Sequence, residues 1–433
     1  MSDVSRMDEV IKSYVADKEF MGSVLVAQNG KVLLSKGYGY ANLEWEVPNS
    51  PTAKFRLGSL TKQFTAVAIL LLEEKGLLQV IDAINKYLPD APVTWHDITI
   101  FNLLTHTHGI PNYTGLPEYA SITTIKKTPA ELIALFRDKP LDFEPGSKYE
   151  YNNSGYILLG SIIEKLSGQS YEDFIVDHIF KPLGMNDSGY DSNLSIIPQR
   201  VSGYTKESDG IWNANFLDMS QPYAAGSLYS TVLDLLTWHS KLFGGKILSP
   251  ISLQKMITPF KEGYGFGVEI KCIDDYNVIM HIGGINGFNT ALIYCQKTQV
   301  SVIVLSNLNT VGYVYDIGFM SQNIALKMVK LAHGNPVILS CERKEAIVSD
   351  KTLSKYVGTY DIKPMMNLAI SLENGRLMAQ FNEQQKIQLF TESETVFFGK
   401  TPDIQIDFPD NNPNKISYLN LYQSGYSLRG HRI

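Results

Sequence analysis

The order of strand and helix signals predicts an α+β protein: an antiparallel sheet flanked by helices, an all-helical subdomain, and then a small all-β barrel. Strand patterns open the chain, become scarce between residues 80 and 200, and return after residue 264. Strands and helices that are segregated along a chain are typical of α+β architectures, whereas strict alternation would indicate α/β. We therefore expect one sheet that is built from both sides of a helical insertion.

Two short-range patterns define the first elements. Two apolar runs within residues 23–35 flank Asn29-Gly30, a dipeptide that supplies the positive φ angles of a tight hairpin turn. In residues 59–75 apolar side chains recur at three- and four-residue spacing, and Gly76 follows as a C-cap. The second pattern predicts a helix with Ser59 at its start.

The middle of the chain supplies further helices and the remaining strands of the sheet. Helices are predicted at residues 129–136, 154–167 and 316–331, the last of which closes the region. Strands are predicted at residues 264–270, 277–280, 290–294 and 300–306.

The pattern changes near residue 345, where short strand-like segments begin to follow one another at regular spacing. These segments are 356–361, 367–372, 386–390, 395–398, 403–408 and 415–422, with a hairpin turn at Asn374-Gly375. Many short strands at such spacing predict a small antiparallel barrel or sandwich.

Length and this change of pattern set the expected domain organisation. A chain of 433 residues is too long for a single core. We expect a first domain at residues 1–345, with a sheet layer at about 1–60 and 205–345 and a helical layer at about 61–204. We expect the barrel at residues 346–433.

Composition excludes several classes of protein. Hydrophobic residues make up 44% of the chain and charged residues 19%, which rules out disorder as the main state. The net charge of -6 is spread evenly, so we expect no nucleic-acid partner. No apolar run is long enough for a membrane span or a signal peptide, so the protein is expected to be soluble and cytoplasmic, or periplasmic or secreted if a leader has been removed. The oligomeric state leaves no mark in the sequence.

The cysteines and histidines give little support to a metal or cofactor. Cys272, Cys295 and Cys341 are widely separated and lack metal-ligand or redox spacing, so we expect buried thiols. His106-Thr107-His108 has the spacing of two metal ligands, but no third ligand lies near it in the sequence. A packed turn with hydrogen-bonded histidines is the better interpretation, and we expect neither a metal nor a cofactor.

Ser59 and Lys62 form the first candidate for chemistry. Residues three apart on a helix share a face, so the Lys62 amine can reach the Ser59 hydroxyl and act as its base when neutral. A free lysine has a pKa of about 10.4, and lowering it by roughly three units costs about 4 kcal/mol, which burial must supply. The pattern is weak by itself, because Ser252 and Lys255 repeat it.

Two more elements make the pattern specific. Tyr151-Asn152-Asn153 follows a Pro-Gly turn and precedes a predicted helix, so a loop presents a phenol that can move protons and an amide that can orient a lysine. Tyr-x-Asn also occurs at residues 40–42 and 418–420, in strand-like segments. His281-Ile282-Gly283-Gly284 runs off a predicted strand, where glycines allow a substrate to approach the backbone and a glycine N–H can bind an oxyanion.

The order and spacing of these three elements resemble the SxxK, YxN and (K/H)xG motifs of the serine β-lactamases and penicillin-binding proteins. The resemblance is to the class C β-lactamase-like branch, which includes D-alanyl-D-alanine carboxypeptidases, D-aminopeptidases and family VIII carboxylesterases. It spans about residues 8–335 and implies a β-lactamase/transpeptidase-like fold, while the C-terminal residues resemble the lipocalin-like appendage of some members.

The resemblance implies a role for each motif residue. Ser59 would be the nucleophile that becomes acylated, and Lys62 with Tyr151 would take its proton and return it to the leaving group. Asn153 would hold Lys62 and contact the substrate. The N–H groups of Ser59 and Gly284 would bind the oxyanion.

His281 and Gly283 would line the opposite wall of the site, and His281 would help to lower the pKa of Lys62 and to position a substrate carboxylate or acyl group. Water activated by Tyr151 would then release the acyl group. The implied partner is a small-molecule or peptide substrate.

Three departures from the family pattern bear on the substrate. His108 replaces a usual serine, Asn152 occupies the middle of the second motif where many members have Ser or Ala, and His281 replaces a lysine. The last is common in peptidases and esterases of this branch. We therefore expect hydrolysis of an ester or a D-amino-acid amide or peptide, with weak β-lactam turnover at most. The alternatives are a true β-lactamase, or a penicillin- or peptidoglycan-fragment-binding protein that does not turn over.

Overall fold

The computed structural model describes residues 3–207, 209–273, 276–310, 319–362, 366–382, 384–400, 403–409, 416–423 and 426–433. The chain packs as two compact units. The larger unit comprises Phe20–Lys206 and Gly210–Asn309, and the barrel unit comprises Met1–Glu19, Glu207–Asp209 and Thr310–Ile433. The predicted boundary after residue 345 stays a prediction.

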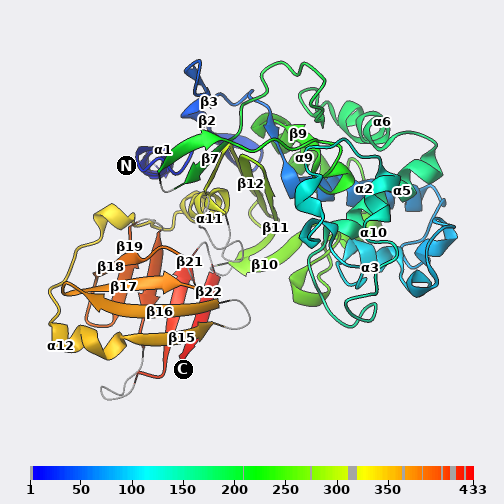
Figure 1. Cartoon of the computed structure of the whole chain (residues 1–433). Coiled ribbons are helices and arrows are strands. Elements are labelled where there is room, and N and C mark those ends of the chain that lie inside the picture. Colours follow the sequence, from blue (N-terminus) through cyan, green and yellow to red (C-terminus); the bar gives the residue numbers. More distant parts are fainter. Residues whose placement is uncertain are drawn as a thin grey trace. The chain divides into compact units, whose positions relative to one another are not determined.

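A six-stranded antiparallel sheet forms one layer of the larger unit, in the order β10-β11-β12-β13-β1-β2. Figure 1 labels four of its strands, β2, β10, β11 and β12. Its strands are β1 (Gly22–Gln28), β2 (Lys31–Tyr38), β10 (Glu269–Ile273), β11 (Tyr276–Ile285), β12 (Phe288–Cys295) and β13 (Val300–Ser306). Because β1 pairs with β13, strands from both sides of the helical region share one sheet, as predicted. At the β1–β2 turn Asn29 and Gly30 have φ angles of 50° and 75°, which is the conformation that this dipeptide favours.

The predicted strand at 264–270 is wrong over most of its length, because β10 begins only at Glu269. Gly267 has a φ of +67°, outside the strand region, and an added Cβ there would lie 2.5 Å from the carbonyl oxygen of Lys62. The segment therefore packs as a loop against the first turn of a helix, an approach that only glycine permits.

Helices and short strands form the rest of the larger unit. The helices are α2 (Thr61–Glu74), α3 (Ile100–Leu104), α4 (Pro129–Ala134), α5 (Asn153–Ser167), α6 (Tyr171–Ile175), α7 (Lys181–Leu183), α8 (Tyr223–Gly226), α9 (Val232–Phe243) and α10 (Pro250–Ile257). The short strands are β3 (Tyr40–Asn42), β4 (Val47–Pro48), β5 (Phe55–Arg56), β6 (Gly189–Tyr190), β7 (Tyr204–Glu207), β8 (Gly210–Asn213), β9 (Leu228–Ser230) and β14 (Leu308–Thr310). The helices predicted from residues 59, 129 and 154 correspond to α2, α4 and α5.

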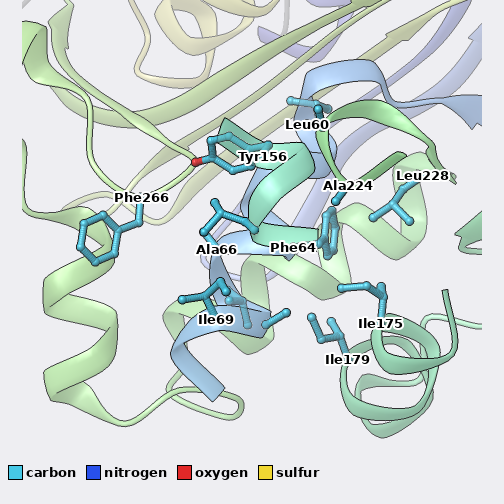
Figure 2. Close-up of a cluster of buried hydrophobic side chains, with 14 of the residues drawn as sticks. Leu60, Phe64, Ala66, Ile69, Tyr156, Ile175, Ile179, Ala224, Leu228 and Phe266 are labelled. Atoms are coloured by element: carbon cyan, nitrogen blue, oxygen red, sulfur yellow. The ribbon is translucent and has the colours of Figure 1, made fainter. Parts of the chain in front are cut away.

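Helix α2 is buried almost throughout and organises the core of the larger unit. It contacts α5, α6 and α8, and Figure 2 shows Leu60, Phe64, Ala66 and Ile69 surrounded by apolar side chains from these neighbouring elements. The Phe64 ring centroid lies 4.2 Å from that of Trp238. A helix enclosed in this way holds its first turn rigidly.

The barrel unit contains a closed eight-stranded antiparallel barrel, drawn in orange to red in Figure 1. Its strands are β15 (Gly358–Ile362), β16 (Met366–Glu373), β17 (Arg376–Phe381), β18 (Ile387–Thr391), β19 (Val396–Gly399), β20 (Ile404–Asp407), β21 (Tyr418–Gln423) and β22 (Tyr426–Arg432). The fold class is therefore confirmed, although the sequence patterns did not show β17 and β22 as separate strands. The same unit has α1 (Asp3–Ala16), α11 (Met320–Ala332) and α12 (Asp350–Leu353). The first residues of the predicted helix 316–331 lie outside the described residues.

The barrel interior is filled by side chains. Leu368, Ala379, Phe397 and Leu421 are fully buried members of its core, together with other apolar residues from strands around the barrel. A core packed in this way holds the barrel together through apolar burial.

Two smaller expectations have mixed outcomes. Cys295 is buried in β12, but Cys272 and Cys341 are exposed, so the expectation of buried thiols is wrong for both of them. Cys272 lies in β10, an edge strand whose neighbour in the sheet is β11.

Among the described residues, no helix combines the length and the apolar content needed to cross a bilayer.

The core around α2 gives a stability prediction. Phe64 is fully buried, so Phe64→Ala should lower the free energy of unfolding of the larger unit by about 3–5 kcal/mol through lost burial and a cavity. Tryptophan fluorescence in a urea titration measures it, because all four tryptophans lie in this unit. Leu194→Ala is the control, since Leu194 is 86% exposed; an equal loss in both variants would contradict the prediction.

Candidate active site

Ser59 and Lys62 meet at the beginning of α2. Ser59 lies in the 3-10 turn Gly58–Leu60, and Lys62 lies in the first turn of the helix that continues it. The Lys62 Nζ atom is 3.0 Å from the Ser59 Oγ atom. Gly58 has a φ of +55° and its Cα faces the backbone of Gly284, so the turn that presents Ser59 depends on a glycine.

Three oxygen atoms surround the Lys62 amine. Besides Ser59 Oγ, these are Asn153 Oδ1 at 2.9 Å and the carbonyl oxygen of Ala225 at 3.0 Å. Only the serine hydroxyl can donate a hydrogen bond, whereas the other two oxygens can only accept. A neutral amine, with two N–H groups and one lone pair, satisfies this set with the lone pair directed at the serine hydroxyl.

Burial favours this neutral form. Lys62 is fully buried, and the burial holds the pKa of its amine well below the ordinary lysine value. Among the described residues no carboxylate forms an ion pair with it. The physical requirement for a lysine base at neutral pH is thus met by burial.

Tyr151 lies beside this pair. Its ring centroid is 4.9 Å from Lys62 Nζ, and its hydroxyl is buried without a hydrogen-bond partner among the described residues. Burial raises the pKa of Tyr151, although the nearby Ser59 hydroxyl acts in the opposite direction. The phenol is therefore protonated at rest and has a hydrogen available for an incoming group.

Asn153 and Asn152 divide two tasks at the start of α5. Asn153 accepts from Lys62 through Oδ1 and donates through Nδ2 to Thr114 Oγ1, 3.2 Å away. Asn152 is the N-cap of α5 and accepts from the backbone N–H of Ser154; its Nδ2 donates to the carbonyl oxygen of Ile110. The asparagine in the middle of the motif therefore serves the local fold and fixes the direction of its neighbour.

The third motif forms an open stretch of strand beside Ser59. Strand β10 pairs with β11 only as far as Glu269 opposite Met280. From His281 to Ile285, the strand pairs with β12 alone among the described residues. An added Cβ at Gly283 would lie 2.1 Å from the carbonyl oxygen of Leu57, so the glycine allows the strand to approach the serine turn. The Thr290 hydroxyl on β12 donates to that same carbonyl and ties the two together.

His281 is held by two hydrogen bonds inside the protein. Its Nε2 atom is 2.8 Å from the Tyr264 hydroxyl and its Nδ1 atom 2.6 Å from the carbonyl oxygen of Ile282. The carbonyl can only accept, which assigns the ring proton to Nδ1 and makes Nε2 the acceptor for Tyr264. Burial lowers the pKa of His281 to about 4. His281 is thus uncharged at neutral pH and adds no positive charge beside Lys62.

The other two histidines of interest are packing residues with hydrogen bonds to the backbone. His106 Nδ1 accepts from the N–H of Asn152, and His108 Nδ1 accepts from the N–H of Ile110. The His106 ring centroid is 4.4 Å from that of Tyr151, so it forms part of the wall behind the phenol. Within the part of the chain that is described, no three His, Cys, Asp or Glu side chains gather as a metal site would require.

The repeated motifs elsewhere have ordinary structural roles. Ser252 lies in α10 and its backbone N–H donates to the Ser249 cap, while Lys255 bonds Glu73. Asn42 donates to Ser202. These residues lie on other elements, and the structure does not bring them to Ser59.

Three contributors were not identified from the sequence. Tyr264 orients His281, the Ala225 carbonyl binds Lys62, and Thr114 binds Asn153. A backbone carbonyl has no sequence signal. Tyr264-Gly265-Phe266-Gly267 was available as a signal, because two glycines so close together argue against a strand interior.

The fold and the paired serine and lysine define a serine hydrolase of the β-lactamase and penicillin-binding-protein kind. Residues 7–319 match the family described as Beta-lactamase, and residues 342–431 match a domain of unknown function, DUF3471. The chain belongs to the β-lactamase family.

Individual proteins are similar over much of the chain. The sequence is 30% identical over 436 residues to penicillin-binding protein 4* of Bacillus subtilis strain 168, covering 94% of each chain. The octameric penicillin-binding protein homologue of Pyrococcus abyssi is 27% identical with a TM-score of 0.70, covering 99% of this chain and 100% of that one. A D-stereospecific amidohydrolase from Streptomyces sp. is 26% identical with a TM-score of 0.62, covering 70% of this chain and 94% of that one.

The buried amine predicts an unusual pH dependence of stability. In the unfolded chain Lys62 regains an ordinary pKa, so between the lowered pKa and about 10.4 the unfolded state binds one more proton. Raising the pH in this window favours the folded state by about 1.4 kcal/mol per pH unit. Relative to Lys62→Met, wild-type protein should therefore gain stability as the pH rises. Urea titrations at pH 7, 8 and 9 measure the difference, with Lys255→Met to report the pH dependence of the rest of the protein; a constant difference would contradict the prediction.

The neutral state of His281 gives a prediction for the pH dependence of kcat/KM. In His281→Asn the loss of the bond to Tyr264 should lower kcat/KM for a neutral ester by about 10- to 100-fold through misplacement of the open strand. The pH at which kcat/KM rises should be the same in the variant and the wild type, because deprotonation of Lys62 and not of His281 determines it. Profiles of both proteins from pH 5 to 10 test this; a limb that disappears or moves in the variant would show that His281 titrates in the reaction.

Proposed function

We propose that the protein is a serine hydrolase that acts through an acyl-enzyme on Ser59. The observation that carries the proposal is the 3.0 Å contact between Ser59 Oγ and a fully buried Lys62 amine. A serine hydroxyl needs a base to become a nucleophile, and the three-oxygen environment of Lys62 directs its lone pair at that hydroxyl.

In the acylation step, Ser59 Oγ attacks the carbonyl carbon of the substrate while its proton passes to Lys62 Nζ. The carbonyl oxygen becomes an oxyanion bound by the N–H groups of Ser59 and Gly284, each worth roughly 3–4 kcal/mol in comparable sites. The bond to the leaving group then breaks, and the leaving group takes a proton from Lys62 by way of Tyr151. A protonated phenol next to Ser59 suits this transfer.

In the deacylation step, a water molecule attacks the acyl carbonyl and gives its proton to the same pair, Tyr151 and Lys62. The oxyanion forms again in the same place and collapses as Ser59 Oγ leaves and regains a proton. Asn153 keeps Lys62 in position and offers its amide to the substrate, while His281 and Gly283 line the opposite wall. No cofactor enters either step.

The substrate is proposed to be an ester or a D-amino-acid amide or peptide. A neutral His281 replaces the lysine of dedicated β-lactamases, and the D-stereospecific amidohydrolase similarity supports a D-amino-acid substrate. A true β-lactamase is the alternative within the same mechanism. A binding protein that does not turn over, with the barrel as its ligand module, is a weaker alternative. Ser59, Lys62, Tyr151 and Asn153 are all present, and the core of the barrel is filled with side chains.

The chain offers a matched control for the nucleophile. Ser59→Ala should abolish labelling by a fluorophosphonate and lower hydrolysis of p-nitrophenyl butyrate by at least about 10³-fold. Ser252→Ala, which removes the serine of the second Ser-x-x-Lys, should keep full labelling and activity. Intact-mass spectrometry and initial rates measure both; full activity in Ser59→Ala would refute the proposal.

A substrate panel separates the alternatives. We expect turnover of p-nitrophenyl butyrate or a D-Ala-D-Ala peptide and little turnover of a chromogenic cephalosporin. Fast cephalosporin turnover without ester or peptide cleavage would establish a β-lactamase. A Ser59 adduct that persists for hours without product would establish a binding protein.

A further inference from the structure

A polar cavity of about 350 Å³ lies in the larger unit, at the turn between β11 and β12. Its walls come from the β11–β12 turn (Asn286, Phe288), from two arginines (Arg56, Arg200), and from the loop that contains Asn215. Its lining surface is mostly polar, and among the described residues that line it the two arginines are the charged ones.

The two arginines converge on one buried carboxylate. Arg56 donates from Nε to Asp191 Oδ2 at 2.6 Å, and Arg200 donates from Nη1 to Asp191 Oδ1 at 2.7 Å. Asp191 is fully buried, whereas the arginine side chains are 15% and 27% exposed. One negative charge faces two positive charges, so the group keeps a net charge of about +1.

Each arginine has donors left over. Arg56 uses only Nε, so both of its Nη groups have no hydrogen-bond partner among the described residues. Arg200 uses only Nη1, which also donates to the carbonyl oxygen of Ser192, and leaves Nε and Nη2. These nitrogens are accessible to solvent, because none of them is among the buried polar atoms that lack a partner. Two free donors on one planar guanidinium match the two oxygens of a carboxylate.

The cavity is close to the proposed oxyanion site along the same strand. Strand β11 ends at Ile285, so Asn286, the first residue of the β11–β12 turn, comes two residues after Gly284, a separation of about 7 Å along the strand direction. The Arg56 guanidinium lies 5.7 Å from the Phe288 ring centroid, at the start of β12, and Arg56 precedes Ser59 by three residues. An acyl group attached to Ser59 can therefore reach the cavity along the open edge of β11.

We propose that this cavity binds a carboxylate carried by the acyl part of the substrate, at about 7 Å or more from the reacting carbonyl. The inference rests on the proposed hydrolase function and names its substrate class: acyl groups that end in an anion. The simpler account, in which Arg56 and Arg200 only neutralise Asp191, leaves the second positive charge and four donors unused.

The test changes the charge of the cavity without breaking the arginine pair with Asp191. Asn215 is exposed, and its side chain has no hydrogen-bond partner among the described residues, since Asn286 Nδ2 donates to its backbone oxygen. Asn215→Asp therefore adds one negative charge at constant size. The experiment compares two esters of equal chain length. Mono-p-nitrophenyl suberate ends in a carboxylate, and p-nitrophenyl octanoate ends in a methyl group. In the wild type, the ratio of kcat/KM for suberate to that for octanoate should exceed the ratio for the shorter pair, glutarate to valerate.

In Asn215→Asp the suberate-to-octanoate ratio should fall about tenfold at low salt, and most of the change should be in KM. Asn29→Asp is the matched control, because it adds the same charge at the β1–β2 turn, where Asp-Gly is as compatible as Asn-Gly. Equal ratios in the two variants would overturn the proposal.

A second measurement separates this proposal from the proposed function. Monomethyl suberate is titrated calorimetrically into Ser59→Ala, with and without Asn215→Asp, so that no turnover is needed. The additional charge should weaken binding about tenfold. If neither ester is hydrolysed, the proposed function fails, but this titration still shows whether the cavity binds a carboxylate. Binding that does not respond to Asn215→Asp would overturn the carboxylate site even in an active hydrolase.

Discussion

An amine buried without a neighbouring carboxylate is the constraint on which the larger unit depends. Lys62 is fully enclosed, and its three oxygen partners come from the serine turn, from α5 and from α8. Keeping a lysine neutral at pH 7 costs several kcal/mol of folding free energy. The apolar core around α2, with Phe64 and its neighbours, is large enough to offset this cost (Figure 2).

The same constraint explains why the side chains in contact with Lys62 are uncharged. A carboxylate next to Lys62 would raise the pKa of the amine and remove its lone pair. The wall is instead made of tyrosines and of histidines whose pKa values burial lowers. In our proposal, the charges for substrate recognition come from Arg56 on β5 and Arg200 before β7, which line a cavity at the β11–β12 turn and do not contact the base.

Much of the fold was predictable because its local signals agree with its packing. Asn29-Gly30 determines the first hairpin, and the spacing of apolar residues determines α2. The segment after Tyr264 was misjudged, because a short run of aromatic and aliphatic residues has the composition of a strand. Its glycines instead allow close approach to backbone carbonyls, Gly265 to that of Met256 and Gly267 to that of Lys62, and the second contact is far away in sequence. The exposed thiols were missed for a similar reason, since the place of Cys272 in an edge strand and of Cys341 in an exposed 3-10 turn are properties of the assembled fold.

The candidate site was predictable as a set of residues but not as an arrangement of protons. Residue types and spacing pointed to Ser59, Lys62, Tyr151 and Asn153, and the structure brings them together. Two details could be seen only in the three-dimensional structure. One is the proton on Nδ1 of His281, which the carbonyl of Ile282 assigns, and the other is the backbone carbonyl of Ala225 that completes the environment of Lys62. Neither depends on a side-chain identity that a motif could record.

The place where β10 stops has a further consequence. Beyond Met280 the open edge of β11 is only five residues long, and a strand presents its outward hydrogen-bonding groups at alternate residues. Such an edge can pair with a segment of about two or three residues, and β10 already occupies the edge on the other side of His281. The architecture thus limits the length of backbone that can pair with β11 beside Ser59. The limit is set on one side by the end of β10 and on the other by the β11–β12 turn.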